Sequence, residues 1–401
     1  MKQGWEIKKV GEVCSFERGL TYAKGDEVAT SSKGVLRSNN IDLITNSLNY
    51  DEIKYLREDF EIPTKKMVRK NSLLMCISNG SKIHLGKVAL IEDDIDYAFG
   101  GFMGLLTPNE AIIHPRYFYY ALISPAYKML IKGLSDGANI NNLKFADLQS
   151  FEIPIPSLAE QERIVEILDR EFERIDALKA NAERNLQHAK DLFQSTLKQE
   201  LQPKEGWVTA SLNDLYDVRD GTHDSPKYTQ QGYPFVTSKN LKDGKIDMSD
   251  VKYISKEDYD KINERSKVDV GDILFAMIGS NLGHPALVVD EPNYAIKNVA
   301  LFKVPSSQSS RLLLYLLSSD LIMDKINKEK SGSSQPFVSL KYLRTFKVSI
   351  PMEYEQQEEL ALRIERLDRI SKRLQSKYIN IIALCDDMKQ ALLRKAFNGE
   401  L

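Results

Sequence analysis

The sequence contains glycine-rich runs of the kind that cradle a phosphate or a nucleotide, but each departs from the pattern that this chemistry needs. The run from Gly80 to Lys87 resembles a phosphate-binding loop, yet it is one residue too long, and Val88 follows it in place of a metal-binding Ser or Thr. Residues 99–104 suggest a nucleotide or S-adenosylmethionine turn, but the matching run 296–301 keeps no glycine. A tight bend or a strand with close backbone approach is the better interpretation.

The acidic residues and histidines form no catalytic or metal-binding pattern. Residues 92–96 hold a cluster of carboxylates, but no Lys follows at the spacing of a metal-dependent nuclease, so we expect a solvated turn. No Asn-Pro-Pro-Tyr or Asp-Pro-Pro-Tyr segment is present to hold an amino group for methylation. The histidines are scattered, without ligand spacing on one helix: His84, His114, His188, His223 and His284. The sequence therefore predicts a non-catalytic chain with no cofactor and no metal site.

Polar loops offer a different chemistry, the reading of base edges in double-stranded DNA. Arg or Lys pairs with guanine and Asn or Gln with adenine, while contacts to phosphates set the register. The candidates in the first half are Arg37, Ser38, Asn39, Asn40, Asn79, Lys82, Asn139 and Asn141. Those in the second half are Thr237, Ser238, Lys239, Asn240, Ser280, Asn281, Ser333, Ser334 and Gln335. Candidate phosphate contacts flank the first strand of each half: Arg18, Lys24, Arg219, His223 and Lys227.

Any single member of this set is equally explained as an ordinary polar turn residue. The set as a whole favours DNA reading, because equivalent loops carry it in both halves of a repeated sequence. The second half repeats the first about 200 residues later. Trp5 matches Trp207, residues 148–156 match 343–351, and the ending Glu200-Leu201 matches Glu400-Leu401. These matches keep one order along the chain, which indicates two copies of one unit.

Each copy is predicted to begin with a mixed α/β (α+β) domain. Segments of alternating or β-branched residues bounded by Gly, Asn and Asp predict short strands at 72–78, 87–91, 271–278 and 286–289. Amphipathic patterns predict helices at 117–130 and 312–326. We predict domain boundaries at 1–157 for the first domain, 158–202 for a first long helix, 203–352 for the second domain and 353–401 for a second long helix.

The two long segments carry a coiled-coil seam. A helix start after proline is expected, and each segment is then free of proline over roughly 40 residues, on the order of 60 Å of helix. Apolar residues recur at heptad spacing along one face. The seam residues of the first helix are Leu168, Phe172, Ile175, Ala182, Leu186, Ala189 and Phe193. Those of the second are Leu360, Ile364, Leu367, Leu374, Tyr378, Ile381, Cys385, Met388 and Leu392.

A single helix of this length with a narrow apolar seam needs a partner, and its repeat mate is the nearest one. We therefore expect the two helices to pair antiparallel, which gives the chain an internal pseudo-two-fold repeat. Docking of each helix on its own domain is the alternative. The charged faces, such as residues 162–170 and 365–373, suit either plain solvent exposure or the binding of a large partner.

The composition limits the classes of protein that remain. Net charge is −2, so any nucleic-acid site must be a local basic patch. No apolar run approaches the roughly 18 residues of a membrane span, and residues 1–5 start no secretory signal, so a cytoplasmic location is expected. Cys14, Cys76 and Cys385 form no CxxC pair and suggest isolated thiols.

Three strings together resemble specificity subunits of type I restriction-modification systems. They are residues 156–165 (PSLAEQERIV), 233–241 (YPFVTSKNL) and 395–401 (KAFNGEL). The resemblance covers essentially the whole chain, although the second helix start at 352–356 is a degraded version of the first. It implies two target-recognition domains that each read half of a split DNA site, with paired helices as the spacer between them.

The same resemblance implies the partners. They are double-stranded DNA, methyltransferase subunits that are expected to number two, and restriction or translocase subunits bound through them, with catalysis supplied by these partners. Because the loops differ between copies, the two half-sites should differ and lie about one helical turn apart. The alternatives are a subunit of another multi-subunit methyltransferase or restriction system, an enzyme that itself methylates or cuts DNA, and a coiled-coil scaffold for proteins.

Overall fold

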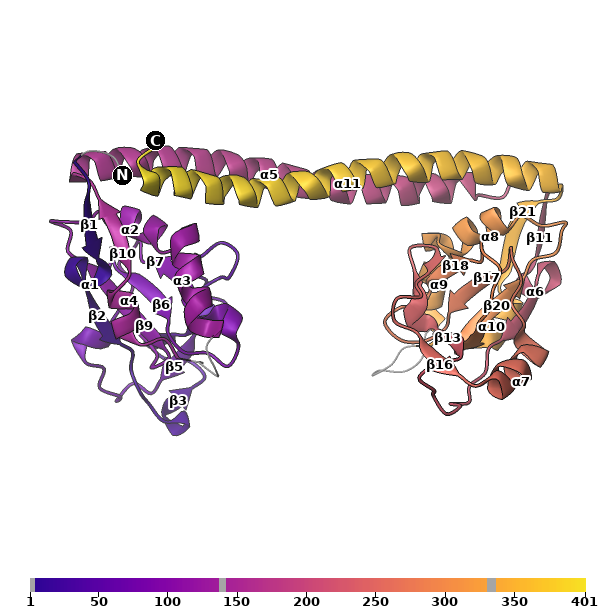
Figure 1. The fold of residues 1–401 in the computed structure, drawn as a ribbon, viewed down its shortest axis with the longest axis horizontal. Helices are drawn as coiled ribbons and strands as arrows, with labels where there is room; N and C mark the ends of the chain where they lie inside the picture. Colours follow the sequence, from indigo (N-terminus) through magenta and orange to yellow (C-terminus); the bar gives the residue numbers. More distant parts are fainter. Residues whose placement is uncertain (1–3, 137–141, 330–336) are drawn as a thin grey trace. The chain divides into compact units, whose positions relative to one another are not determined.

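The computed structural model describes residues 4–136, 142–329 and 337–401. The chain divides into two compact units: unit 1 comprises Met1–Ala182 and Asn380–Leu401, and unit 2 comprises Glu183–Ile379. Each unit contains a mixed α and β domain together with part of both long helices (Figure 1). The predicted fold class is confirmed.

Unit 1 is built from short strands, and the internal strand β6 (Leu73–Cys76) is buried along its whole length. Its strands are β1 (Glu6–Lys9), β2 (Cys14–Arg18), β3 (Glu27–Val28), β4 (Lys33–Leu36), β5 (Lys54–Leu56), β6 (Leu73–Cys76), β7 (Val88–Leu90), β8 (Tyr97–Phe99), β9 (Met103–Pro108) and β10 (Glu152–Ile155). Its domain helices are α1 (Val10–Val13), α2 (Pro115–Ala121), α3 (Pro125–Asp136) and α4 (Phe145–Gln149). The sheets have the orders β1-β10, β2-β9-β6-β7 and β3-β5-β4-β8.

Unit 2 repeats this plan. Its strands are β11 (Trp207–Ser211), β12 (Asp217–Asp220), β13 (Tyr233–Thr237), β14 (Leu241–Lys242), β15 (Lys245–Ile246), β16 (Lys252–Ile254), β17 (Ile273–Ala276), β18 (Pro285–Leu287), β19 (Ala295–Lys297), β20 (Val299–Lys303) and β21 (Lys347–Pro351). Its domain helices are α6 (Leu212–Leu215), α7 (Lys256–Ser266), α8 (Ser310–Leu317), α9 (Asp320–Glu329) and α10 (Leu340–Thr345). The order β12-β20-β17-β18 matches β2-β9-β6-β7, so the sequence repeat is a repeat of topology.

The predicted strands are confirmed as β6, β7, β17 and β18. The helices predicted as continuous at 117–130 and 312–326 are each two helices, with breaks after Ala121 and Leu317. In unit 1 Pro125 has no N–H to continue a helix, and the Ser124 hydroxyl oxygen instead accepts from the Tyr127 N–H. In unit 2 the Ser319 hydroxyl bonds back to the Leu316 carbonyl, which competes with the helical ladder.

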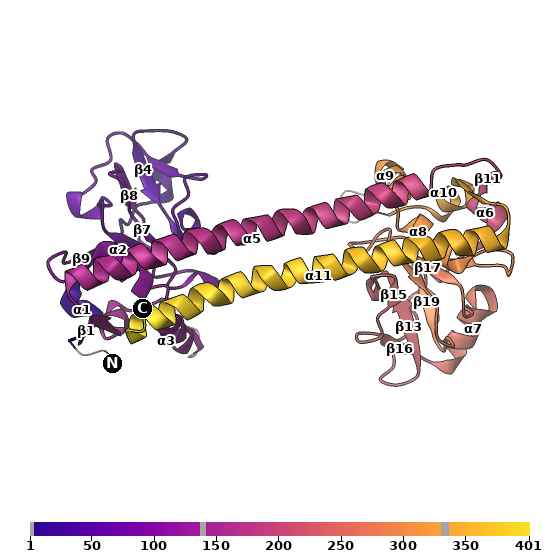
Figure 2. The same ribbon diagram turned by 90° about the horizontal axis from the view of Figure 1, so that it is seen from above.

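The long helices are α5 (Leu158–Glu200) and α11 (Tyr354–Asn398), and within each unit they run antiparallel (Figure 2). In unit 1, Lys179 pairs with Asp386 at 2.7 Å and Lys389 with Asp176 at 2.5 Å. In unit 2, the Ser371 hydroxyl donates to the Ala189 carbonyl at 3.0 Å. Along both helices, rising numbers on one meet falling numbers on the other, as an antiparallel pair requires.

The predicted seam residues lie mostly on the shared faces of these helices. On α5, Leu168, Ile175, Ala182 and Ala189 are buried, while Phe172, Leu186 and Phe193 are half-buried. On α11, Leu360, Ile364 and Cys385 are buried, and Leu367, Tyr378, Ile381 and Leu392 are half-buried. Leu374 and Met388 are 37% and 47% exposed, so these two predicted seam positions are not buried.

The end of one helix completes the core of each domain. In unit 1, Leu393 and Ala396 of α11 pack in one cluster with Trp5, Tyr117 and Leu168. In unit 2, Leu197 of α5 and Leu201 after it pack with Tyr216 and Leu360. Each domain is thus fixed to both long helices of its own unit by buried apolar side chains.

Buried glutamines at the helix starts add polar links. Gln161 accepts from the His114 N–H at 2.8 Å and donates to the carbonyls of Ile112 and Pro156 at 3.0 and 2.9 Å. Gln357 accepts from the Ser309 N–H and donates to the Pro351 carbonyl. The second helix start, although degraded in sequence, therefore keeps the glutamine that joins helix to domain.

Candidate nucleic-acid interfaces

The predicted DNA-reading loops of the first domain meet around one hollow of about 660 Å³, which we call hollow 1. Its walls come from the segment after β2, the loop after β4, the turn after β6 and the turn between β8 and β9. It is lined by Leu20, Thr21, Tyr22, Lys24, Glu27, Arg37, Ser38, Asn39, Ser78, Asn79, Gly80, Gly100, Gly101, Phe102 and Met103. Lys24, Arg37, Ser38, Asn39 and Asn79 are sequence-predicted residues that the fold brings together.

The corresponding loops of the second domain surround hollow 2, of about 400 Å³. It is lined by Tyr228, Phe235, Thr237, Ser238, Lys239, Asn240, Asp250, Lys252, Ile278, Gly279, Ser280, Asn281, Lys297 and Asn298. The predicted residues Thr237, Ser238, Lys239, Asn240, Ser280 and Asn281 all lie here. Matching backbone contacts frame both hollows, since Leu20 bridges Gly100 in the first and Thr222 bridges Lys297 in the second.

The loops after β4 and β13 adopt the same short 3-10 turn, held by a buried asparagine. The Asn40 side chain is 0% exposed, and its amide oxygen accepts from the Arg37 N–H at 2.8 Å. The Asn240 oxygen accepts from the Thr237 N–H at 3.0 Å. Both amide nitrogens also donate to loop carbonyls. For these two asparagines the geometry favours a structural role, in which the side chain holds the loop, and not the predicted contact with a base.

Two serines in the same turns are also engaged with neighbouring loops. The Ser38 hydroxyl accepts from the Asn79 amide at 2.9 Å, and the Ser238 hydroxyl donates to the Asn298 carbonyl at 2.9 Å. The Asn281 amide donates to the Leu241 carbonyl at 3.2 Å. These bonds hold the loops of each hollow to one another, which leaves a preformed recess rather than separate loops.

Cationic and phenolic groups give hollow 1 its chemistry. Within the described residues, Nε of Arg37 is buried and has no hydrogen-bond partner. Burial and the nearby Glu27 carboxylate raise the pKa of Tyr22, while the Arg37 charge acts against them. Lys24 is exposed at the rim. Arg37 thus brings to hollow 1 a guanidinium, the group that pairs with guanine O6 and N7.

Hollow 2 is lined by more lysines. Lys239 is exposed, Nζ of Lys252 lies 4.3 Å from the centroid of the Tyr228 ring, and the Lys297 ammonium donates to the Ser225 hydroxyl. Sequence reasoning missed Lys252 and Lys297, as it missed Tyr22 and Phe102 in hollow 1. The sequence did offer one signal for Lys297, since this residue lies in the run 296–301 that matches the glycine-rich turn 99–104 of the first domain.

Of the predicted phosphate contacts, Lys24 lines hollow 1, while the other four line neither hollow and several of them have protein partners. Arg18 ends β2 and lies 6.0 Å from the Phe145 ring centroid, while Arg219 pairs with Asp217 at 2.6 Å. Lys227 is exposed, and Lys82 is exposed on a 3-10 turn that does not line hollow 1. The predicted residues Asn139, Asn141, Ser333, Ser334 and Gln335 lie outside the described residues.

His223 lies beside Asn298 at the edge of hollow 2. Its two ring nitrogens are 2.8 Å from Oδ1 of Asn298 and 2.8 Å from Oδ2 of Asp220. These contacts, the Asn298 hydrogen bond above all, raise the pKa of His223. Two facing acceptors favour the imidazolium, and because they take both of its N–H groups, His223 acts on a phosphate here only through its charge.

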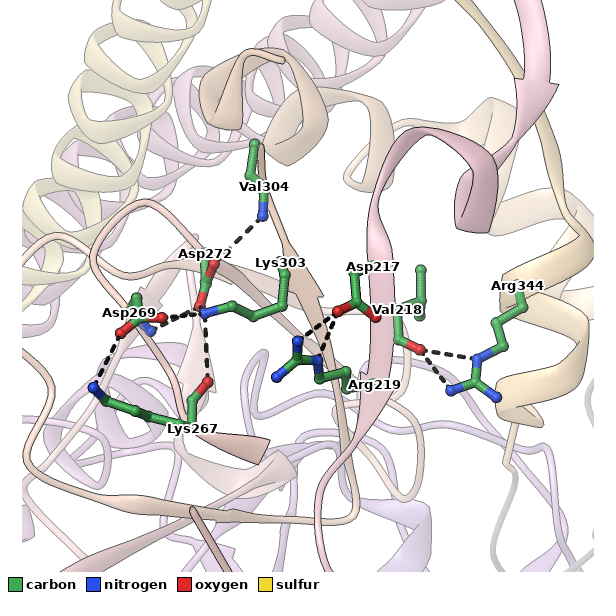
Figure 3. Close-up of polar contacts among 9 residues, drawn as sticks. All are labelled: Asp217, Val218, Arg219, Lys267, Asp269, Asp272, Lys303, Val304 and Arg344. Carbon is green, nitrogen blue, oxygen red and sulfur yellow. Dashed lines mark hydrogen bonds and ion pairs between the residues drawn. The ribbon is translucent and has the colours of Figure 1, made fainter. Parts of the chain in front are cut away.

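A network of polar contacts in unit 2 ties β12 and β20 to the loop before β17 and to α10 (Figure 3). Lys303 of β20 lies 2.5 Å from carboxylate oxygens of both Asp269 and the buried Asp272, and it lowers the pKa of Asp269 by donating to it. On the other side of β12, Arg344 of α10 donates two hydrogen bonds to the Val218 carbonyl, at 2.7 and 2.9 Å. These contacts fix β12 and β20, which pair with each other in one sheet. Asn298, which lines hollow 2, directly precedes β20.

The fold and the hollows define a protein with two matched recognition domains, each joined to a pair of long helices. The family model described as the type I restriction modification DNA specificity domain matches residues 2–187 and 204–382. The chain therefore belongs to the family of type I restriction-modification specificity subunits. The resemblance found in its sequence is confirmed.

Relatives support this assignment over the full length. The chain is 27% identical to the type I restriction enzyme EcoKI specificity subunit of Escherichia coli strain K12, over 100% of this chain and 90% of that protein. It is 25% identical to the StySPI specificity subunit of Salmonella potsdam, with the same coverage.

Two solved structures share the fold, each at 18% sequence identity. One, from a study of complex assembly and conformational transition of the type I R-M system, has a TM-score of 0.82 and covers 100% of this chain and 99% of that chain. The other is the HsdS subunit from Thermoanaerobacter tengcongensis, with a TM-score of 0.58 and coverage of 100% and 98%. Among the residues that the structure describes, no helix is long and apolar enough to cross a membrane.

Proposed function

We propose that this chain is the non-catalytic DNA-reading subunit of a type I restriction-modification complex, in which hollows 1 and 2 each face one half of a split DNA site. The observation that carries the proposal is the pair of equivalent hollows with different linings. Equivalent position makes both hollows readers, and unequal side chains make the two half-sites different. Identical linings would instead predict a palindrome.

The charges of the hollows fit a polyanionic ligand despite the net charge of −2 for the whole chain. Hollow 1 has Lys24 and Arg37 against one carboxylate, and hollow 2 has three lysines against Asp250. Phosphate contacts give affinity and register, while groups inside the recess read base edges. We assign base reading to Arg37 and Asn39 in hollow 1, and to Lys239 and Ser280 in hollow 2.

The paired helices act in this proposal as the spacer between the half-sites and as the docking surface for methyltransferase subunits, with two expected. Restriction or translocase subunits bind through these, and all catalysis resides in the partners. Both α5 and α11 present long charged faces outside the seam, and these faces support two docking surfaces. A cytoplasmic location follows from this role.

The experiment removes one cation from each hollow in the complex of this chain with its methyltransferase. Arg37→Ala should relax base preference in one half-site only, and Lys239→Ala in the other only, by about 5- to 150-fold at the affected position. Lys70→Ala and Lys261→Ala are matched controls, because both lysines are exposed and line neither hollow. Selection from a randomised DNA library measures the preference. Equal effects of all four variants on both half-sites would contradict the proposal.

A further inference from the structure

The turn between β8 and β9 in the first domain corresponds to the turn between β19 and β20 in the second. The first of these turns is one residue longer than the second, counted between matching backbone hydrogen bonds. Both copies anchor it on a glycine: the Gly19 N–H donates to the Met103 carbonyl, and the Gly221 N–H donates to the Val299 carbonyl, each at 3.0 Å. Phe99 and Ile296 accept the next bond in the two copies. Residues 100–102 lie between these anchors in the first domain, but only residues 297 and 298 in the second.

The additional residue presents an aromatic ring at hollow 1. Phe102 is 70% exposed and lines the hollow, whereas the corresponding place in the second domain is taken by Asn298, whose amide oxygen contacts His223. At this place the two hollows differ in kind, with an apolar ring at hollow 1 and the Asn298 amide at hollow 2.

The backbone that carries Phe102 is held in place. Its carbonyl accepts from both the Ile77 and Ser78 N–H groups, at 3.0 and 3.1 Å. A Cβ added to Gly19 would lie 1.9 Å from the Gly100 carbonyl oxygen, so the turn packs on the segment after β2 at a distance that only glycine permits. An exposed ring on a fixed backbone is preorganised for contact, since little freedom remains to be lost on binding.

Hollow 1 combines this ring with the polar groups that read base edges. A Cβ added to Gly100 would lie 3.6 Å from Cγ of Arg37. The Arg37 side chain and the turn that carries Phe102 are therefore neighbours. In the major groove the only apolar group on a base edge is the C5-methyl of thymine, and an aromatic ring is one of its usual contacts. A polar amide at the same place, as in hollow 2, has no such preference.

We propose that Phe102 is a specificity-determining residue that reads the C5 edge of one pyrimidine in the half-site of the first domain, with thymine preferred through its methyl group. This inference rests on the function proposed above and adds to it a base class and an atom. The second domain, with Asn298 in that place, reads no C5 edge through this turn.

The test scans the C5 position of every pyrimidine in both half-sites, with the methyltransferase complex of this chain and synthetic duplexes. Each thymine is replaced singly by deoxyuridine, and each cytosine by 5-methylcytosine. The wild-type complex should show one position in one half-site where the C5 substituent changes Kd by about fourfold, the effect of one buried methyl group. Phe102→Ala should abolish that difference, and Phe102→Leu should keep part of it.

Ile83→Ala is the matched control, because Ile83 is an exposed apolar residue of the same domain, at 64%, that does not line hollow 1. In Ile83→Ala, the C5 substituent should change Kd at the same position and by the same factor as in the wild type. Thermal unfolding of each variant checks the fold, which Phe102→Ala should leave intact because the ring is exposed and its backbone bonds remain.

Three results would overturn the inference. The first is a scan of Phe102→Ala that is superimposable on that of the wild type. The second is an affected position in the half-site that Lys239→Ala relaxes. The third is an equal loss of affinity for all duplexes in Phe102→Ala, which is expected if the ring inserts between base pairs. In each case sequence-specific binding by the wild-type complex still supports the proposed function. A wild-type complex with no base preference in either half-site would contradict both.

Discussion

Gln161 is the polar link whose removal should be felt most strongly in unit 1. Its side chain is 0% exposed and makes three hydrogen bonds, one from the His114 N–H and two to the Ile112 and Pro156 carbonyls. Gln161→Met keeps the length of the side chain and removes all three bonds. It leaves one backbone N–H and two carbonyls without their partner where α5 meets the domain.

The expected magnitude follows from the number of groups left behind. A buried polar group deprived of its partner costs about 1–3 kcal/mol, so the lower figure for each of three groups gives a loss of about 3 kcal/mol in the free energy of unfolding of unit 1. Gln357 makes two such bonds in unit 2, and Gln357→Met should therefore cost about 2 kcal/mol there.

The chain carries its own reporters for this measurement, because it has two tryptophans and each unit holds one. Trp207→Phe leaves Trp5 to report on unit 1, and Trp5→Phe leaves Trp207 to report on unit 2. Urea unfolding followed by fluorescence should then assign each loss to its own unit. Gln187→Met on the exposed face of α5 is the control and should change either transition by less than about 0.5 kcal/mol. If Gln161→Met behaves like this control, the three hydrogen bonds do not hold helix and domain together.

Three further predictions concern the hollows and the helices. Gly19→Ala places a Cβ 1.9 Å from the Gly100 carbonyl oxygen and should cost unit 1 at least about 2 kcal/mol in Trp5-monitored unfolding, while Gly25→Ala, with open space around it, should be near neutral. Because the pKa of His223 is raised on folding, its contribution to stability should be full below its unfolded pKa of about 6.5 and disappear as pH rises through the folded value; His223→Gln should remove this part of the pH dependence of urea unfolding, and an unchanged pH profile would refute it. Removing one heptad from both α5 and α11 should change the preferred gap between half-sites in library selection and leave their sequences alone, and an unchanged gap would exclude the helices as the spacer.

The arrangement of the chain was predictable from its sequence because it depends on periodic patterns. The repeat of residues around Trp5 and Trp207 indicated two copies, and heptad spacing indicated paired helices, since an apolar seam must be buried somewhere. The breaks at Ser124 and Ser319 were not predicted. In unit 2 the break depends on the bond of the single Ser319 hydroxyl, which competes with a helix that the apolar pattern alone would continue. In unit 1 the signal was present in the sequence, because Pro125 has no N–H to continue the helix.

The hollows were predictable as groups of loops but not residue by residue. Residue type alone predicted Arg37 and Lys239 as readers of bases, and it predicted Asn40 equally. The Asn40 amide instead points inward, because its oxygen accepts from the Arg37 N–H within the 3-10 turn. Phe102 was missed because apolar residues in a glycine-rich turn normally suggest packing. Its exposure results from one additional residue between two fixed anchors, which only the comparison of the two folded copies reveals.

The decisive measurement is modification mapping of DNA from cells that carry this chain and its methyltransferase, because it identifies both half-sites and the gap between them at once. We expect one asymmetric motif, made of two different short half-sites separated by a fixed number of unspecified bases. A palindromic motif, one uninterrupted motif, or no modification that depends on this chain would contradict it.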